Sequence, residues 1–234
     1  MRIVALVAAS ALVAGCSQVP VGKPGPTELT PITPSRTGSA SKATSPATTT
    51  TATTTSASAA APGRGASAAE AIAWVEAAPP VDGADFNVAL RNGTATSLGD
   101  DTAFTTPFGT SCMTDTKRVA TGLACLVNLV DPPAQPPDVY GAWKGGWVDY
   151  DGSGVRIGSA HGDPGRFSAG QGAPLPQGGS LSFGDFRCRT DTTAMLCVNY
   201  ADKTAVRYSD DGIDVFGCTR QTPPQAGIGI QYTC

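Results

Sequence analysis

Two segments of the chain repeat one another around a pair of cysteines. Phe108–Asn128 and Phe183–Asn199 each read Phe-Gly, then Cys-x-Thr-Asp-Thr, then a second Cys, and each ends in Val-Asn. The cysteines enclose twelve residues in the first copy and eight in the second. Both numbers are even, as two residues directly opposite each other in an antiparallel hairpin require. The repeat therefore predicts two β-hairpins, each closed by a disulfide, Cys112–Cys125 and Cys188–Cys197.

Three of the seven cysteines lie outside this repeat. Cys218 and Cys234 enclose fifteen residues that include Pro223-Pro224, and we predict that their disulfide fastens the C-terminal tail to the domain. Closing a loop of this size contributes about 3 kcal/mol in the chain-entropy model. A zinc or redox site is disfavoured, because the chain has no Cys-x-x-Cys and His161 is its single histidine. We predict no metal and no cofactor, and Cys16 is left for another role.

Cys16 follows a segment typical of bacterial export. Met1-Arg2 carries one positive charge, and Ile3–Val13 is a run of eleven residues that is apolar apart from Ser10. Such a run spans about 16 Å as a helix, roughly half of a bilayer core, so it predicts a signal peptide and not a membrane span. Val13-Ala14-Gly15-Cys16 resembles a bacterial lipobox, which implies cleavage after residue 15 and acylation of Cys16. The alternative is an ordinary signal peptide that is cut near a cysteine.

Acylation of Cys16 would determine where the protein lies. Two or three acyl chains, at about 0.8 kcal/mol per buried methylene, hold a protein stably on a membrane surface. The predicted partner of the N-terminus is therefore the membrane, and the predicted location is the extracytoplasmic face of the cell membrane.

Residues 16–66 are predicted to be a disordered, lipid-anchored tether. Between residues 41 and 69, 27 of 29 positions hold Ser, Thr, Ala, Pro or Gly. Such a segment buries too little apolar surface to offset its ordering entropy of about 1–2 kcal/mol per residue. Serine- and threonine-rich stalks are often O-glycosylated, so Thr48–Thr55 are candidate acceptors. A bare linker is an equally good interpretation.

The folded domain is predicted to span residues 67–234 and to open with a short helix. Ser67-Ala68-Ala69-Glu70 fits a capping box, and Pro79-Pro80 ends the element. Beyond it the pattern is typical of strands, with alternating apolar residues over Phe86–Leu90 and a turn signal at Asn92-Gly93. We predict a mainly β domain, either an antiparallel sheet or a small sandwich or barrel with duplicated disulfide hairpins.

Part of this pattern resembles a family of small secreted or lipid-anchored proteins of mycobacteria and their relatives. The resemblance covers roughly residues 104 to 217 and rests on the cysteine pairs with nearby Gly, Phe and Asn. The matching residues are Thr106-Pro107, Gly109, Cys112, Cys125, Leu175–Gly179, Phe186-Arg187-Cys188, Cys197-Val198-Asn199, Tyr208-Ser209 and Val215-Phe216. The family often has Gly-His-Gly where this chain has Lys203-Thr204-Ala205. The family has no assigned activity, so the resemblance implies a fold and a cell-envelope location.

The net charge of the chain excludes a basic nucleic-acid-binding surface along its whole length. The chain has 16 basic and 19 acidic residues and a net charge of −3. Proteins that bind nucleic acid need a basic surface to neutralise phosphates. We therefore predict no nucleic-acid partner.

No catalytic constellation is evident. His161 is the single candidate base, and Ser159 is too near it in sequence to be its obvious nucleophile. No Gly-x-Ser-x-Gly segment is present. We predict that the protein is not an enzyme.

A weak calcium signal lies in Asp149–Gly154, which copies the first half of a calcium-binding loop. The candidate ligands are Asp149, Asp151 and Ser153, but Ala160 stands where the loop needs a bidentate glutamate. A tight β-turn explains the segment more simply.

An aromatic cluster, Tyr140, Trp143, Trp147 and Tyr150, offers a possible ligand-binding surface. It holds two of the three tryptophans and two of the five tyrosines, among glycines. Exposed rings of this kind stack on sugars, whereas buried rings form the core of a β layer. The core interpretation is favoured, because aromatic side chains are more often buried than used for binding.

We therefore expect a non-enzymatic, membrane-anchored lipoprotein with a binding or structural role in the cell envelope. Its possible partners are a glycan, a glycolipid or a protein. The alternative is a carrier of lipid or glycolipid, which needs a large apolar cavity.

Overall fold

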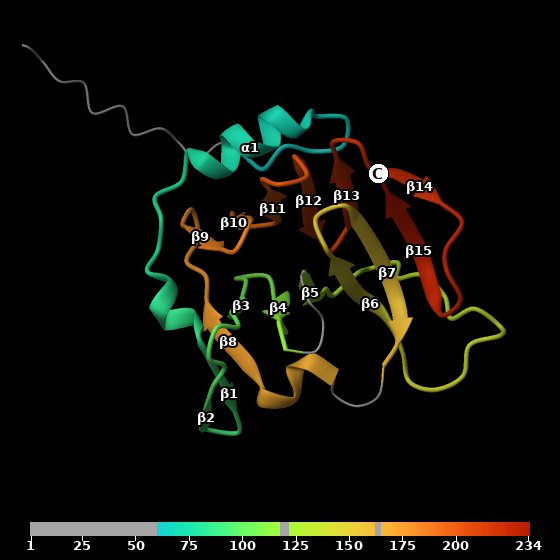
Figure 1. Ribbon diagram of the computed structural model, residues 1–234, viewed down its shortest axis with the longest axis horizontal. Coiled ribbons are helices and arrows are strands. Elements are labelled where there is room, and N and C mark those ends of the chain that lie inside the picture. Colours follow the sequence, from blue (N-terminus) through green and yellow to red (C-terminus); the bar gives the residue numbers. More distant parts are fainter. Residues whose placement is uncertain (1–59, 118–121, 162–164) are drawn as a thin grey trace, which may run out of the picture. The chain divides into compact units, whose positions relative to one another are not determined.

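The computed structural model describes residues 60–117, 122–161 and 165–234, which all belong to one compact unit, Thr53–Cys234 (Figure 1). The predicted signal peptide (residues 1–15), Cys16, the candidate glycosylation sites Thr48–Thr55 and most of the predicted tether lie outside the described residues.

The described chain forms one α-helix, two short 3-10 helices and two β-sheets. The elements in chain order are α1 (Ala68–Glu76), η1 (Gly83–Phe86), β1 (Val88–Arg91), β2 (Thr94–Ser97), β3 (Ala103–Thr105), β4 (Ser111–Thr114), β5 (Leu123–Leu126), β6 (Trp143–Tyr150), β7 (Gly154–Ala160), η2 (Gly165–Ala169), β8 (Gln171–Pro174), β9 (Ser180–Phe183), β10 (Phe186–Thr190), β11 (Met195–Asn199), β12 (Thr204–Ser209), β13 (Gly212–Phe216), β14 (Arg220–Thr222) and β15 (Ile228–Thr233).

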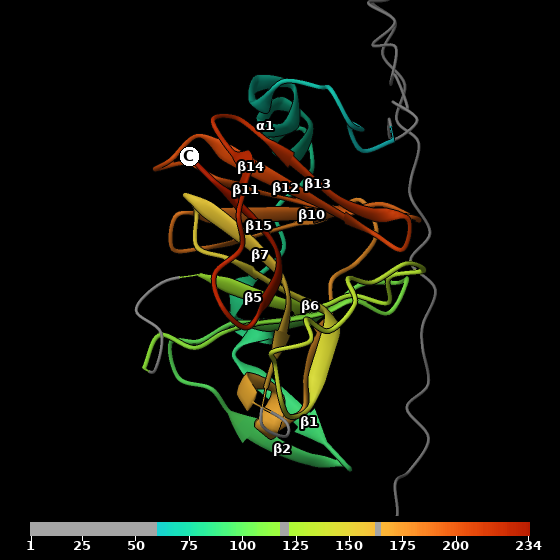
Figure 2. The ribbon, with the colours of Figure 1, turned by 90° about the vertical axis from the view of Figure 1, so that its right-hand side faces the viewer.

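The two sheets pack face to face, as Figure 2 shows from the side. The large sheet has the strand order β14-β15-β7-β6-β5-β4-β3-β8-β1-β2, and the small sheet has the order β13-β12-β11-β10-β9. Neighbouring strands are antiparallel, apart from the parallel pair β3 and β8. Side chains of both sheets, such as Val148 and Val206, share one buried core. The prediction of a mainly β, antiparallel domain is confirmed, and its architecture is a sandwich.

The duplicated hairpins are β4–β5 in the large sheet and β10–β11 in the small sheet. Cys112 lies directly opposite Cys125, and Cys188 lies directly opposite Cys197, and each pair is joined by a disulfide. All four cysteines are fully buried in the core between the sheets. One copy of the repeat therefore occupies each layer, and the two disulfides lie within the core that joins the layers.

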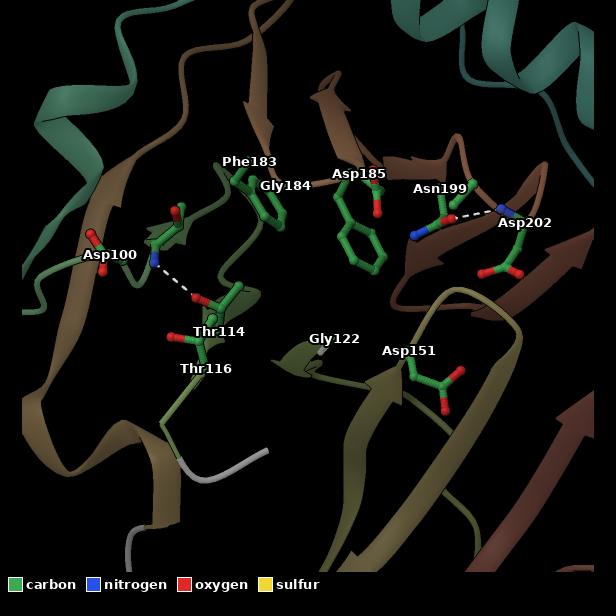
Figure 3. A pocket seen from close by; sticks show the side chains of 13 residues that line it. Asp100, Thr114, Thr116, Gly122, Asp151, Phe183, Gly184, Asp185, Asn199 and Asp202 are labelled. Atoms are coloured by element: carbon green, nitrogen blue, oxygen red, sulfur yellow. Dashed lines mark hydrogen bonds between the residues drawn. The ribbon is translucent and has the colours of Figure 1, made fainter. Parts of the chain in front are cut away.

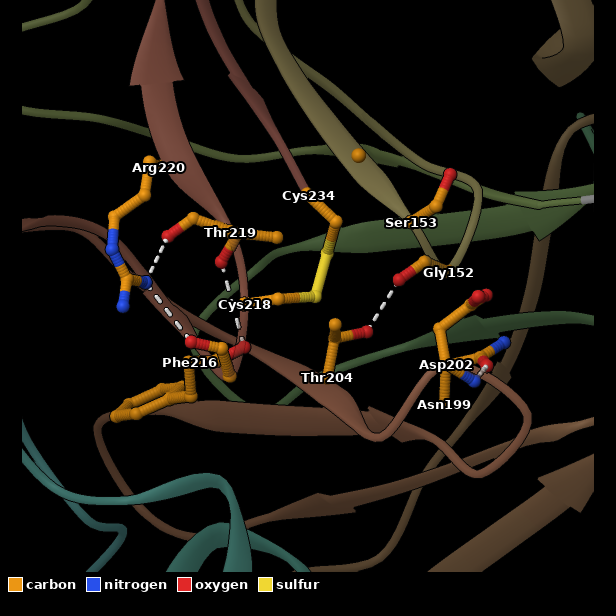
Figure 4. The surroundings of a disulfide bond; sticks show 12 residues. Gly152, Ser153, Asn199, Asp202, Thr204, Phe216, Cys218, Thr219, Arg220 and Cys234 are labelled. Carbon is orange, nitrogen blue, oxygen red and sulfur yellow. Dashed lines mark hydrogen bonds between the residues drawn. A yellow bond between two sulfur atoms is a disulfide. The ribbon is translucent and has the colours of Figure 1, made fainter.

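A third disulfide joins Cys218, which follows β13, to the C-terminal Cys234 (Figure 4). The Cys234 amide donates to the carbonyl oxygen of Ser153 over 3.1 Å. Since β13 belongs to the small sheet and β15 to the large sheet, this disulfide fastens the last strand to the junction between the two layers.

Helix α1 covers the outer face of the small sheet. The predicted capping box is present, with the Glu70 amide donating to Ser67 Oγ over 3.2 Å and the Ser67 amide donating to Glu70 Oε2 over 2.7 Å. Trp74 and Val75 pack on Leu196 and other apolar residues of the sheet. The helix is thus stabilised both by its N-terminal cap and by tertiary packing.

The ordered contacts begin before the predicted domain boundary at residue 67. The Ala61 amide donates to Asp191 Oδ2 over 2.9 Å, and Arg64 pairs with Asp214 over 3.1 Å. Ala61 and Ala66 also pack against the apolar cluster under α1. Composition misses this boundary, because Ala, Pro and Gly fill both the tether and the first packed residues.

Candidate functional site

A cavity of about 310 Å³ lies where the two sheets meet at one end of the sandwich (Figure 3). The large sheet and its loops supply one wall, and the small sheet and its turns supply the other. The lining residues are Asp100, Thr102, Thr114, Thr116, Gly122, Asp151, Phe183, Gly184, Asp185, Phe186, Asn199, Ala201 and Asp202.

Two phenylalanines give the cavity an aromatic wall. Phe183 ends β9 and Phe186 begins β10, and they are paired across the two-residue turn Gly184-Asp185. Their rings are stacked, with centroids 5.7 Å apart and an interplanar angle of 14°. Phe186 also packs edge-on against the buried ring of Tyr150 at 5.3 Å. These core contacts fix the orientation of the phenylalanine pair.

The large-sheet wall presents hydroxyl groups that are held by Asp101. Thr114 Oγ1 donates to Asp101 Oδ1 over 2.9 Å and accepts a hydrogen bond from the Thr102 amide, also over 2.9 Å. The Thr116 amide donates to the same Asp101 oxygen over 2.7 Å. Burial alone raises the pKa of Asp101, but these hydrogen bonds outweigh it and leave the pKa below its usual value. Asp101 therefore acts as a charged anchor for the threonines.

On the small-sheet wall, Asn199 is buried and lies beside Asp202. Its Oδ1 accepts the Asp202 amide over 2.9 Å, and only 3% of the residue is exposed. Within the described part of the chain, Asn199 Nδ2 has no hydrogen-bond partner, and Figure 3 shows this nitrogen directed toward the cavity. Gly152 makes this arrangement possible, because a Cβ there would lie 2.8 Å from Asn199 Nδ2 and 2.5 Å from an Asp202 oxygen.

The four carboxylates of the cavity divide into two kinds. Asp151 accepts the amides of Ser153 and Gly154 and pairs with Arg156 over 2.9 Å. The carboxylates of Asp100, Asp185 and Asp202 have no such partners among the described residues. The described lining contains no Lys, Arg or His. The described lining therefore suits a polar ligand that is neutral or positively charged better than an anion.

The possible aromatic binding surface does not form. Trp147 and Tyr150 are each 1% exposed, so the ligand-stacking role is wrong for these two residues, and the core interpretation that the sequence favoured is confirmed for them. Residues three apart on a strand point to opposite faces, so Tyr150 enters the core between the sheets whereas Trp147 packs against Phe167 on the outer face. Trp143 is half-buried and donates from its indole nitrogen to the Pro133 carbonyl over 2.9 Å. Tyr140 is 88% exposed and lies apart from the buried rings.

The three candidate calcium ligands are not arranged around a common point. Asp149 faces Arg166, at 3.6 Å. Asp151 accepts the hydroxyl of Ser153 over 3.1 Å, which is the tight-turn geometry that the sequence favoured. Across the described residues, no three His, Cys, Asp or Glu side chains are grouped to hold a metal ion.

Ser159 and His161 are in contact, which the sequence argument did not expect. Ser159 Oγ lies 2.5 Å from His161 Nε2, because residues two apart on a strand share a face. The imidazole stacks on the Trp147 ring with centroids 3.6 Å apart. Burial lowers the pKa of His161, although the charge of Asp149 opposes this. Among the described residues, no carboxylate hydrogen-bonds the second ring nitrogen as the third group of a triad does.

Apart from Asp151, which was a candidate calcium ligand, the cavity residues were not assigned to a site from the sequence. Phe183, Phe186 and Asn199 were visible as parts of the duplicated segment, but the repeat was interpreted through its cysteines. Asp100 and Asp202 lie in turns that carry no motif. These positions come together only because the two sheets pack face to face. One local signal for the site was present, namely a polar Asn199 directly after the apolar Cys197-Val198 of a predicted strand.

Comparison with known proteins identifies no relative. No protein-family model matches the chain, and neither the curated proteins nor the solved structures contain a match. Among the described residues, no helix has both the length and the apolar character needed to cross a bilayer.

Proposed function

We propose that this protein is an exported, membrane-anchored lipoprotein whose β domain binds a sugar of the cell envelope, without catalysing a reaction on it. The observation that carries the proposal is the cavity between the sheets, which combines the Phe183–Phe186 pair with hydroxyl, amide and carboxylate groups. Sugar rings present C–H faces that pack on aromatic rings, and their hydroxyls both donate and accept hydrogen bonds.

The individual groups match these two requirements. Asp185 and Asp202 accept hydrogen bonds from sugar hydroxyls, whereas Asn199 Nδ2 donates to a sugar oxygen. The carboxylates of Asp100, Asp185 and Asp202 are exposed, whereas Phe186, Thr102 and Thr114 are buried and Phe183 is half-buried. The hydroxyls at the edge of a bound sugar ring thus form hydrogen bonds, and the face of the ring makes apolar contact with the phenylalanines.

A carrier of lipid or glycolipid is the weaker proposal. A volume of about 310 Å³ lies at the lower end of the range for small-molecule pockets, about 300–1,000 Å³. Carboxylates in the wall disfavour acyl chains, because burying them against hydrocarbon without partners is costly. The size and polarity of the cavity therefore favour a sugar over an acyl chain.

Calorimetric titration of the lipidated protein in mild detergent tests the binding role. The probes are cellotriose, maltotriose and the β-1,4 trimer of N-acetylglucosamine. We expect at least one trisaccharide to bind, and we expect Phe183→Leu to weaken it about three- to tenfold through loss of the flat ring. The control is Phe108→Leu, which changes the equivalent residue of the first repeat outside the cavity. Absence of binding by all three probes, or equal weakening by both variants, contradicts the proposal.

The membrane anchor is tested on the same protein. A fatty-acid analogue fed to the producing cells labels the chain, and the label is expected to be lost in Cys16→Ser. Label retained in that variant contradicts acylation at Cys16.

A further inference from the structure

Three carboxylates without partners surround the mouth of the cavity. Asp100 precedes β3, Asp185 lies in the β9–β10 turn, and Asp202 follows β11, so three separate segments bring negative charge to one opening (Figure 3). The lining that the structure describes contains no basic side chain to compensate this charge. The three carboxylates lie on different sides of the cavity and give it a negative potential that attracts a positively charged ligand.

A second and independent feature favours a ligand that also accepts a hydrogen bond. Asn199 is 3% exposed, and its Nδ2 is directed into the cavity with no partner among the described residues. Nδ2 is open to the cavity, so a ligand oxygen placed there can accept its hydrogen bond. A metal ion cannot supply that oxygen, but an organic ligand can.

The phenylalanine pair adds a third requirement. The stacked rings of Phe183 and Phe186 offer a flat apolar face and a negative ring quadrupole. Both properties favour a compact ligand with C–H groups and a nearby positive charge.

We propose that the sugar bound in this cavity carries a free, protonated amino group, as a hexosamine without its acetyl group does. This inference rests on the proposed function and names its substrate class. The ammonium group pairs with the rim carboxylates, a ring oxygen or hydroxyl accepts from Asn199, and the sugar ring packs on the phenylalanines.

Two matched trisaccharides test the amino group directly. The β-1,4 trimer of glucosamine and cellotriose share ring, linkage and length, and differ in bearing an ammonium or a hydroxyl at each second carbon. At pH about 6 the amines are protonated and exposed carboxylates are ionised. We expect the glucosamine trimer to bind the lipidated protein at least about tenfold more tightly than cellotriose, with affinity that falls as salt increases.

Substitutions of the rim aspartates test which carboxylates recognise the positive charge of the ligand. Asp185→Asn and Asp202→Asn keep the size of the side chain and are each expected to weaken the glucosamine trimer about tenfold while changing cellotriose binding little. The matched control is Asp138→Asn, an exposed aspartate outside the cavity that is expected to have no effect. Equal effects of the rim variants and the control overturn the inference.

Spermidine separates an amino sugar from an amine of another source. The inference is supported if spermidine binds at least about tenfold more weakly than the glucosamine trimer, because it lacks the ring and the oxygen acceptors. It is overturned if spermidine binds as tightly. If cellotriose binds as tightly as the glucosamine trimer, the cavity does not recognise the amino group, but the sugar-binding role stands. If no trisaccharide binds, the sugar-binding role itself is wrong.

Discussion

At the scale of single residues, the two most buried tyrosines of the core differ in the fate of their hydroxyl groups. The Tyr150 hydroxyl lies 2.8 Å from Thr204 Oγ1, whereas the Tyr208 hydroxyl is buried with no hydrogen-bond partner among the described residues. A buried polar group without a partner lowers stability, and a buried paired one adds to it. The same substitution is therefore expected to act in opposite directions at the two positions.

We predict that Tyr150→Phe lowers the free energy of unfolding by about 1 kcal/mol, because it leaves Thr204 with one hydrogen bond fewer. Tyr208→Phe is expected to leave stability unchanged or to raise it by up to about 1 kcal/mol. Urea denaturation at pH 7 measures both. Equal losses in the two variants would show that the Tyr208 hydroxyl is paired after all.

The same pair of variants has a distinct signature at high pH. Burial raises the pKa of both tyrosines, while in the unfolded chain tyrosine ionises near pH ~10. The stability that comes from keeping them neutral is fully present below pH ~10 and is lost as the pH rises above it. The alkaline loss of stability is accordingly expected to be shallower in Tyr208→Phe than in the unmodified protein.

Residue identity alone predicted some of these features and not others. Cysteine spacing predicted the two hairpins, because a disulfide across a strand pair depends on local sequence separation. The capping box at Ser67 is also local and could be predicted. Asn199 and Asp202 could not be assigned to a site, since their role depends on Gly152, which lies in a turn of the other sheet.

At the scale of elements, three neighbouring strands of the large sheet each carry one glycine beneath the loop that contains Pro132 and Pro133. A Cβ on Gly145 or Gly229 would lie 2.8 Å from a proline side-chain atom, and a Cβ on Gly158 would lie 2.7 Å from the Trp143 ring. The prolines are Pro132 and Pro133, which cross these strands at close range. The glycines thus form a shallow channel across β6, β7 and β15 in which the loop rests.

Gly158→Ala is predicted to destabilise the domain by at least about 2 kcal/mol. Its φ of 74° costs an L-residue about 1 kcal/mol, and the collision with Trp143 adds about 1–3 kcal/mol. Gly178 is the matched control, because its φ is 75° and a Cβ there meets nothing within 4 Å. Gly178→Ala is expected to cost about 1 kcal/mol. Thermal unfolding of the two variants gives the difference, and equal losses would place the whole effect in the backbone.

The element β6 also shows where sequence reasoning failed. The pattern Trp143–Tyr150 was interpreted as one cluster because its aromatic residues are close in sequence. A strand separates such residues onto two faces, and this strand has a register irregularity between Lys144 and Val148 that no sequence signal announces. The type of the element was predictable, but the face of each side chain was not.

At the scale of the whole molecule, seven residues that composition assigns to the tether belong to the packed domain. Residues 60–66 include the Ala61 amide, which donates to Asp191, and Arg64, which pairs with Asp214. Burial alone raises the pKa of Asp191, but the amides of Thr193, Ala61 and Ala194 outweigh it and leave the pKa below its usual value. The segment therefore contributes to the electrostatics of the small sheet.

Deleting residues 60–66 is predicted to lower the free energy of unfolding by about 1–2 kcal/mol at pH 7, through the lost Asp191 hydrogen bond. A control deletion of residues 48–54 removes the same length from the predicted tether and is expected to have no effect. A carboxylate with a lowered pKa stabilises above pH ~4 and loses this effect as the pH falls, so the difference should shrink in acid. Urea denaturation at pH 7 and below pH ~4 measures the difference in unfolding free energy between the two deletions. Equal effects of the two deletions would place the start of the folded domain at residue 67, as predicted from the composition.

The Ala61–Asp191 contact gives the domain a mechanical polarity. In the proposed lipoprotein, a pull from the membrane would reach the domain near residue 60, and the Ala61–Asp191 hydrogen bond would pass part of it to the β10–β11 turn. Phe183 and Asn199 belong to the same sheet, so in the proposed complex hydrogen-bonded strands would join the N-terminal attachment to the ligand contacts. The disulfide Cys188–Cys197 also joins β10 to β11 covalently, so these two strands would stay paired under such a load.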